Sequence, residues 1–313
     1  MFTTPSKLRK AGIVGMNWRN VRMIAQYNPR RLYPQVDDKL KTKLLLAKAN
    51  LSAPELLGVV KTQGNVRELE EFLADCGPFV IKPANGSGGK GILVIAGRDG
   101  GKFVKPSGSG IDIAEVRKHA SSIISGLYSL GGRSDVAMIE EMVQFSDAFD
   151  GFSFQGVPDI RIIVYKGYPV MAMTRLSTRA SDGKANLHQG AVGLGIDIGT
   201  GRALKAVQNG RPLTHHPDTG KELATFDVPQ WNDFVLQASM CYEITTMGYL
   251  GVDLVLDKEK GPQILELNAR PGLAIQIAND MGLLPRFEVV DAQDGIERTA
   301  AERTVFARQQ FVA

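Results

Sequence analysis

A glycine-rich segment, FVIKPANGSGGKGI at residues 79–92, carries the first chemical signal. Glycines let backbone N–H groups turn toward phosphate oxygens without obstruction by side chains. A Walker A loop does not fit, because it needs glycine at position 84 and serine or threonine at position 91, where the chain has Ala84 and Gly91. The dinucleotide fingerprint at Gly86, Gly88 and Gly91 must open a helix, whereas a β-type run follows here.

The remaining interpretation of this segment is a strand–loop–strand flap that covers the phosphates of a nucleotide. Protein kinases use such a flap, but the chain contains neither an HRD nor a DFG sequence. A plain glycine-rich turn is the alternative for this segment taken alone.

A second signal lies at residues 251–272, where two strand-like runs flank the turn Lys258–Gly261. With a four-residue turn, Asp253 falls opposite Glu266, with Cβ atoms about 5 Å apart. Asn268 shares the face of Glu266, because strand side chains alternate. Two carboxylates this close repel unless a cation lies between them, and this all-oxygen set suits Mg²⁺ that carries phosphates and water. The alternative is an exposed acidic face on an edge hairpin.

Composition limits the class of protein. The 313 residues are 43% hydrophobic and 22% charged, with a net charge of +4, which is too small to indicate a nucleic-acid partner. The two cysteines lie far apart, so a zinc module and a disulfide scaffold are excluded. No apolar run reaches the roughly 18 residues of a membrane span, and residues 1–10 lack the apolar core of a signal peptide. We therefore expect a soluble, cytoplasmic protein.

Charge is uneven along the chain. Residues 1–48 hold eleven basic and two acidic residues, so this segment carries +9 and the remainder −5. Such a run is usually a solvated helix face. The functional alternative is a surface for an anionic substrate or an acidic partner.

The elements that must position these motifs are a mixture of helices and hairpins. Periodicity, turn residues and caps predict helices at 13–27, 38–47, 66–73, 114–130 and 230–247 and from about 272, and strands at 79–82, 91–96, 136–143, 159–165, 169–176, 252–257 and 262–268. Residues 177–190 and 206–230 are predicted loops. Hairpins in place of regular βαβ units favour an α+β fold.

Taken together, the ordered motifs resemble the ATP-grasp superfamily, and within it the RimK-like glutamate ligases and the proteins described as alpha-L-glutamate ligase-like. The resemblance runs from about residue 36 to 285. It rests on the helix DKLKTKLLLA at 38–47, on "DIR" at 159–161, on "NLHQG" at 186–190, and on the flap and the carboxylate hairpin. Two departures are a lysine at position 90 in the glycine-rich loop and the roughly 36 residues before the first helix, too few for a full preceding domain.

The resemblance implies an α+β ATP-grasp fold of two subdomains that clasp ATP. We expect a basic N-terminal arm at 1–36 that packs on the body or forms a subunit contact, an N-terminal subdomain at 37–139, a C-terminal subdomain at 140–285 and a helical tail at 286–313.

It also implies roles for individual residues. Mg²⁺, or Mn²⁺ in its place, would be held by Asp253, Glu266 and Asn268. The nucleotide would be bound by Lys39, Lys82, Asn85, Gly86, Ser87, Gly88, Gly89, Gly91, Glu140, Glu141, Met142, Asp159, Lys184 and Asn186. The reacting groups would be faced by Arg175, Arg161 and Asn186. For each charged residue the alternative is a structural ion pair.

The implied reaction is amide formation through an acyl phosphate, in which glutamate or a similar amino acid joins an amine or peptide acceptor. A kinase that stops at phosphoryl transfer and a non-catalytic ATP-binding regulator are the alternatives. Expected partners are small-molecule or peptide substrates, an acidic partner at the basic arm and further copies of the chain, with no nucleic acid and no membrane insertion.

Overall fold

A computed structural model describes residues 4–313 except 87, 130, 155 and 157. The chain forms two compact units. Unit 1 comprises residues 1–36, 49–52 and 145–313, and unit 2 comprises residues 37–48 and 53–144. Thus the basic N-terminal segment and the C-terminal residues belong to the same unit. Within the described residues, no helix is long and apolar enough to cross a membrane.

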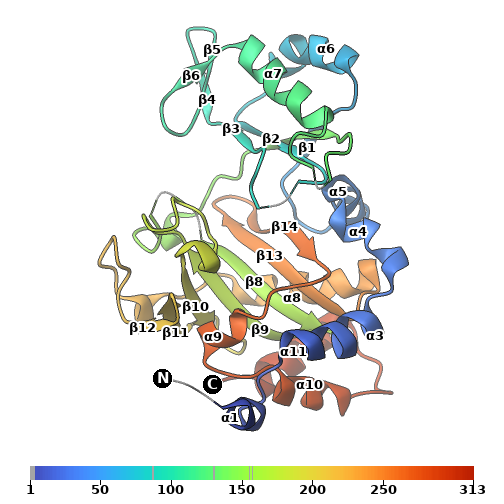
Figure 1. Ribbon diagram of the computed structural model, residues 1–313, viewed down its shortest axis with the longest axis vertical. Coiled ribbons are helices and arrows are strands. Elements are labelled where there is room, and N and C mark those ends of the chain that lie inside the picture. The colour runs from blue at the N-terminus through green and yellow to red at the C-terminus, as the bar shows by residue number, and fades with distance from the viewer. Residues whose placement is uncertain (1–3, 87, 130, 155, 157) are drawn as a thin grey trace. The chain divides into compact units, whose positions relative to one another are not determined.

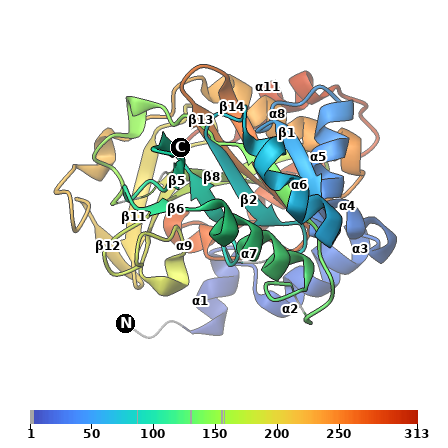
Figure 2. The ribbon, with the colours of Figure 1, turned by 90° about the horizontal axis from the view of Figure 1, so that it is seen from above.

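Unit 2 is built on a four-stranded antiparallel sheet with the order β1-β7-β2-β3, formed by Leu56–Val60, Ala137–Glu141, Phe79–Pro83 and Leu93–Ile95. Helices α6 (Gln63–Leu73) and α7 (Ile113–Ile124) pack on each other (Figures 1 and 2). Helix α7 also contacts β2 and β7. Both begin with capping boxes, at Thr62 and at Asp112. Their apolar stripes bury Leu69, Leu73, Val116 and Ile123 in the core of this unit.

The remaining elements of unit 2 are small. Strands β4 (Gly97–Asp99), β5 (Lys102–Val104) and β6 (Gly110–Ile111) form a separate three-stranded sheet. Helix α5 (Lys39–Lys48) begins as predicted after Asp38, whose carboxylate accepts hydrogen bonds from the backbone of Leu40 and Lys41. The prediction of a helix over 114–130 is wrong at its end, because α7 stops before Gly126, which has a φ of 87°.

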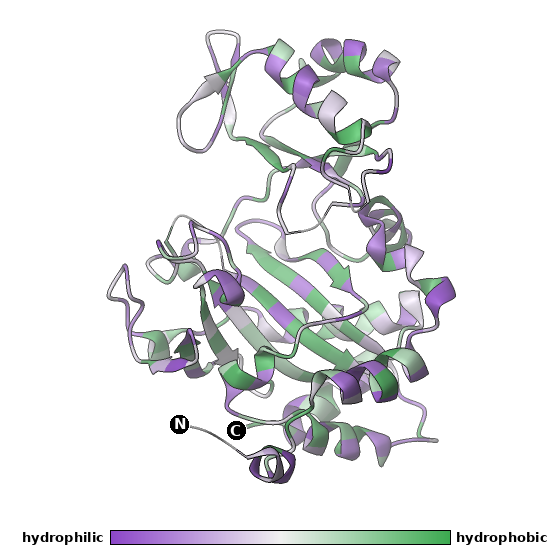
Figure 3. Cartoon of the chain, in the orientation of Figure 1, coloured by the Kyte–Doolittle hydropathy of each residue, from purple (hydrophilic) through white to green (hydrophobic). Residues whose placement is uncertain are grey.

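Unit 1 is built on a seven-stranded sheet with the order β12-β11-β10-β9-β8-β13-β14, in which every pairing is antiparallel. Strands β8 (Asp159–Tyr165) and β9 (Tyr168–Leu176) form the predicted hairpin. Its turn residues Lys166 and Gly167 both have positive φ, as a type I′ turn requires. Figure 3 shows these central strands as mostly hydrophobic, in agreement with their almost complete burial.

Strands β13 (Tyr249–Asp257) and β14 (Gly261–Asn268) form the predicted carboxylate hairpin, but the turn is shorter than expected. Asp257 pairs with Gly261, not with Pro262, so the loop has three residues, 258–260, and Gly261 directly after it has a φ of 72°. This change alone would shift the register by one. A bulge at Leu265 shifts it back, and Asp253 still pairs with Glu266.

The prediction of a loop over 206–230 is wrong in part. Strands β11 (Ala203–Gln208) and β12 (Arg211–Leu213) extend the sheet beyond β10 (Val192–Ile196), and only one short 3₁₀ turn, Leu223–Thr225, follows before residue 230. Asn209 and Gly210, both with positive φ, connect the two strands. The strands are short, and few of their residues are buried, which explains why their alternation is weak in the sequence.

Helices complete unit 1. Helix α8 (Trp231–Thr245) packs on α11 (Ala300–Gln310) and on the sheet, and α9 (Ile275–Asn279) and α10 (Leu284–Asp291) also contact the sheet. The N-terminal segment contains α1 (Pro5–Lys10), α2 (Met16–Trp18), a π-helical turn (Arg19–Ile24), α3 (Ala25–Tyr27), a 3₁₀ turn (Arg30–Leu32) and α4 (Pro34–Asp37). Two further 3₁₀ turns lie at Asp147–Phe149 and Leu187–Gln189.

The N-terminal segment is anchored to unit 1 by specific contacts. Asn28 is buried and donates from its side chain to the carbonyls of Tyr249 and Ala269. Trp18 stacks on Phe287 with ring centroids 6.2 Å apart. These side-chain contacts therefore hold the N-terminal segment against the rest of unit 1.

Candidate active site

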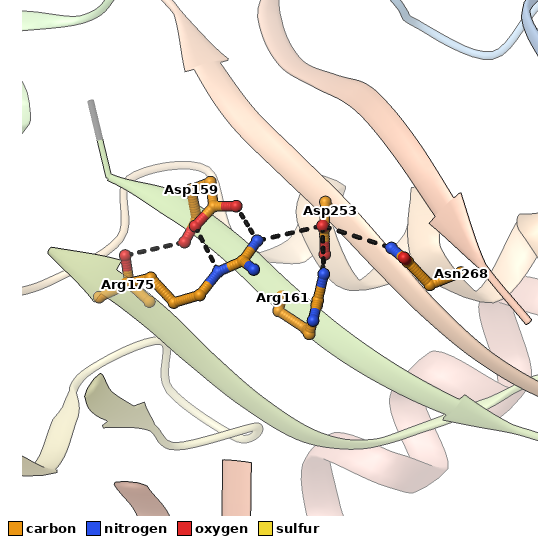
Figure 4. A network of polar contacts seen from close by, with 6 residues as sticks. Asp159, Arg161, Arg175, Asp253 and Asn268 are labelled. Carbon is orange, nitrogen blue, oxygen red and sulfur yellow. Dashed lines mark hydrogen bonds and ion pairs between the residues drawn. The ribbon is translucent and has the colours of Figure 1, made fainter. Parts of the chain in front are cut away.

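An ion-pair network lies on the seven-stranded sheet of unit 1 (Figure 4). Arg161 donates to both carboxylate oxygens of Asp253, with Nε 2.6 Å from Oδ1. Arg175 donates to Asp253 Oδ2 at 3.1 Å and makes a two-pronged pair with Asp159, with Nε 2.8 Å from Oδ1. Two arginines and two aspartates therefore form one continuous cluster.

Strand register explains why these four residues meet. Asp253 pairs directly with Arg161 across β13 and β8, and Asp159 pairs directly with Arg175 across β8 and β9. Paired residues point to the same face, and so do residues two apart along β8. The cluster thus follows from which strands are neighbours.

The charged groups of this cluster shift the pKa values of one another. Burial would raise the pKa of the Asp253 carboxyl, but the guanidinium groups of Arg161 and Arg175 hold that pKa below its usual range. Burial raises the pKa of Asp159 to about 6, with the Asp253 charge acting in the same direction and Arg175 opposing it. The pKa values of both arginines are raised by these carboxylates in spite of burial, so both stay cationic.

The predicted metal ligands lie beside this network. Glu266 is paired with Asp253 across the hairpin, and Asn268 Nδ2 lies 3.4 Å from Asp253 Oδ2. Among the described residues, no group of three or more His, Cys, Asp or Glu side chains converges on a point. Register places Glu266 and Asn268 on the same face of the hairpin as Asp253, and carboxylate and amide oxygens are the hard donors that fit Mg²⁺, although Asn268 directs its amide nitrogen to Asp253 here. Asp253 is already neutralised by two arginines, so a cation would share or replace their contacts.

Two other predicted residues of unit 1 lie on a loop. Asn186 caps the 3₁₀ turn Leu187–Gln189, where its side-chain oxygen accepts from the N–H of His188 at 3.0 Å. Lys184 is exposed and pairs with the exposed Asp182 at 3.4 Å. Within the part of the chain that the structure describes, these contacts do not join either side chain to the Asp253 network.

The glycine-rich loop of unit 2 is the predicted strand–loop–strand element, because β2 and β3 pair antiparallel on either side of it. Gly88, Gly89 and Gly91 all have positive φ, which only glycine adopts readily. Asn85 is held by Asp135, which accepts from its backbone and side-chain nitrogens, and Lys39 Nζ donates to the Gly86 carbonyl at 2.6 Å. Ser87 lies outside the described residues.

A second charged cluster lies on the sheet of unit 2. Lys82 Nζ is 2.6 Å from Glu140 Oε2, and Lys43 Nζ is 3.2 Å from Glu140 Oε1. Lys43 also donates to the Pro54 carbonyl at 2.6 Å. Burial lowers the pKa of Lys43 to about 8, although the Glu140 carboxylate opposes this shift. The single buried carboxylate of Glu140 therefore forms ion pairs with both lysines.

Lys43 was not among the residues predicted from the sequence. Its spacing of four from Lys39 places both on one face of α5, and this could have indicated it. Glu141 and Met142 were also predicted to bind the nucleotide; Glu141 is the last residue of β7, and Met142 follows it. The Glu141 carboxylate accepts from the N–H of Glu55, and the N–H of Met142 donates to the Pro78 carbonyl.

Comparison with known proteins defines the class. A family model described as sugar-transfer associated ATP-grasp matches residues 18–292, so the chain belongs to this family and has the ATP-grasp fold. The α+β architecture and the RimK-like resemblance predicted from the sequence are therefore confirmed.

Curated relatives are distant. The chain is 25% identical over 236 residues to a probable alpha-L-glutamate ligase of Aliivibrio salmonicida, covering 75% of this chain and 56% of that protein. It is 23% identical over 257 residues to a ribosomal protein bS6--L-glutamate ligase of Shigella boydii, covering 82% and 63%. The chain thus spans less than two thirds of the length of these relatives. Among solved structures, D-alanyl-alanine synthetase A of Vibrio cholerae has a TM-score of 0.47 at 9% identity, covering 90% of this chain and 66% of that one.

Proposed function

We propose that this protein is an ATP-dependent ligase that joins a carboxylate to an amine through an acyl phosphate. The observation that carries the proposal is the Asp253–Glu266 pair with Asn268 beside it, on the sheet face that also presents Arg161 and Arg175. Family membership and the ligase names of the relatives support it.

In this proposal, unit 2 binds the nucleotide. Lys39 and Lys82 neutralise phosphate oxygens, and the backbone N–H groups at Gly88, Gly89 and Gly91 line the phosphates. Glu141 and the Met142 backbone contact the adenine. Glu140 forms ion pairs with Lys43 and Lys82. Closure of the glycine-rich loop keeps water from the reactive acyl phosphate.

Unit 1 holds the reacting carboxylate. Asp253, Glu266 and Asn268 would hold Mg²⁺, or Mn²⁺ in its place, which when bound neutralises phosphate oxygens. Arg175 and Arg161 face the negative charge that develops on the acyl and phosphoryl oxygens. Asn186 supports the phosphates, Lys184 adds positive charge at the loop, and Asp159 accepts a ribose hydroxyl or, as in the structure, orients Arg175.

The proposed substrates are based on the names of the relatives. Their names indicate glutamate as the amino acid and, for one of them, a protein as the acceptor. We propose glutamate or a similar amino acid and an amine or peptide acceptor, in a cytoplasmic protein that forms homo-oligomers.

ADP release measured with and without an amine acceptor tests the proposal. A ligase forms ADP in step with an amide product that mass spectrometry detects, and it depends on both substrates. ADP formation on a carboxylate alone with a stable phosphorylated product would indicate a kinase, and MgATP binding without turnover would indicate a regulator.

A further inference from the structure

A cavity of about 1160 Å³ lies wholly within unit 1. We call it the arm pocket, because the N-terminal segment forms one wall with Leu8, Ile13 and Met16. The outer strands β11 and β12 form a second wall with Leu204 and Leu213, and α9 forms a third with Ile277. The lining is mostly apolar.

The arm wall is fixed in place by a buried side chain. Gln276 of α9 accepts from the backbone N–H of Val14 at 2.8 Å and donates to the Val14 carbonyl at 3.0 Å. Gln276 is itself buried, and its Oε1 also accepts from the N–H of Leu283. A satisfied buried amide of this kind makes the wall a defined part of unit 1.

The arm pocket adjoins the candidate active site of unit 1. Gly195 of β10 lets α9 approach the sheet, because a Cβ there would lie 2.6 Å from the Ala278 carbonyl oxygen. A Cβ on Gly193 would point to the same side, toward Leu187 at 2.7 Å and Ala278 at 3.4 Å. Gly193 is the direct partner of Arg175, so α9 and Arg175 share one face of the sheet. The loop after Asn268 continues into the pocket through Gly272 and Leu273.

The walls and the rim differ in chemistry. Met16, Ile277 and Leu8 leave 66%, 57% and 43% of their surface exposed, which is costly in a pocket that stays empty. The rim carries both signs, with Arg19, Glu222 and the ion pair Lys205–Asp280. This balance does not suit the acidic side chain of a glutamate, which calls for a cationic pocket.

We propose that the arm pocket binds a peptide segment with bulky apolar side chains as the acceptor substrate of the ligation. This assignment rests on the proposed function and narrows its substrate class. The cavity exceeds the roughly 300–1,000 Å³ typical of small-molecule sites. The mixed rim offers donors and acceptors to peptide groups, whereas a single alkyl carboxylate would leave most of them unused.

An array of acetylated, amidated decapeptides with graded contents of Leu, Met and Phe tests the proposal without nucleotide. We expect wild-type binding to rise with apolar content and to fall about tenfold or more in Ile277→Lys, because a charge then enters the apolar wall. Val305→Lys is the matched control, since Val305 is 55% exposed on α11 and lies outside the pocket. The milder variant Ile277→Ser and the melting temperatures of all variants show whether a loss of binding comes from misfolding.

Three outcomes would overturn the proposal: no peptide binding, equal losses in Ile277→Lys and Val305→Lys, or binding of dodecanoate but not of the apolar peptides. MgATP binding, measured on the same protein samples, distinguishes failure of the peptide assignment from failure of the proposed function. If MgATP binds and apolar peptides do not, the peptide assignment fails while the nucleotide chemistry stands.

Discussion

The two charged clusters of this protein are built on opposite balances. In unit 2, Lys43 and Lys82 share the single carboxylate of Glu140, so one positive charge is left over. In unit 1, Arg161 and Arg175 face Asp159 and Asp253, and the charges cancel before Glu266 is counted. The net positive charge of the unit 2 cluster suits an anion such as a phosphate, whereas Glu266, which pairs with Asp253 across the hairpin, adds a carboxylate that suits a cation. The two clusters therefore favour ligands of opposite charge.

Breaking the balanced cluster should have the largest effect on stability. Arg161→Met leaves the buried Asp253 without its two-pronged partner, and we expect a loss of about 3–5 kcal/mol in the free energy of unfolding. Urea denaturation measures it. Arg202→Met, at an exposed pair with Asp227, should cost at most about 1 kcal/mol. Equal losses for the two variants would show that the network is not a buried unit.

Replacing Glu266 should affect the reaction more than the fold. Glu266→Gln keeps the shape and removes one of two facing carboxylates, so the free energy of unfolding should stay equal or rise slightly. ADP formation should fall on the order of 100-fold, with a smaller change in nucleotide affinity. Exposed Glu288→Gln is the control. Wild-type turnover in Glu266→Gln would contradict the metal-site assignment.

The pH dependence of stability sharpens the comparison on the side of unit 2. Lys43 loses its proton near pH 8 when folded and near 10.5 when unfolded, so between these values the unfolded state binds more protons. The stability of the wild type should therefore rise with pH across this window, by up to about 3 kcal/mol relative to Lys43→Met. Lys41→Met, exposed on the same helix, should leave the slope unchanged.

The smallest effect is expected in the glycine-rich loop. A Cβ at Gly89 meets no atom within 4 Å, so Gly89→Ala adds only the strain of a φ of 73°, about 1 kcal/mol. Gly100→Ala, also at positive φ in open space and outside the loop, should cost as much stability. Calorimetry should show weaker MgATP binding in Gly89→Ala alone. An equal change in both variants would argue against a phosphate-binding loop.

Local patterns in the sequence predicted much of this fold. Lys166-Gly167 marked the tight β8–β9 turn, Asp38 marked the start of α5, and the glycine-rich loop was placed between paired strands. Short strands with few buried residues were missed, as at 203–208 and 211–213, because they show no alternation of apolar and polar residues. The Asp253–Glu266 pairing was predicted correctly from a turn of the wrong length, because the bulge at Leu265 compensated for it.

The sequence by itself determined the ordered set of motifs, the α+β class and the acids of the hairpin, because turns, caps and strand alternation act over a few residues. Only the tertiary structure decided that Arg161 and Arg175 neutralise Asp253, that Lys43 shares Glu140 with Lys82, and that the N-terminal arm completes a pocket with α9. These depend on which distant strands and helices become neighbours. That choice is made by burial of the whole core, and no local pattern in the chain records it.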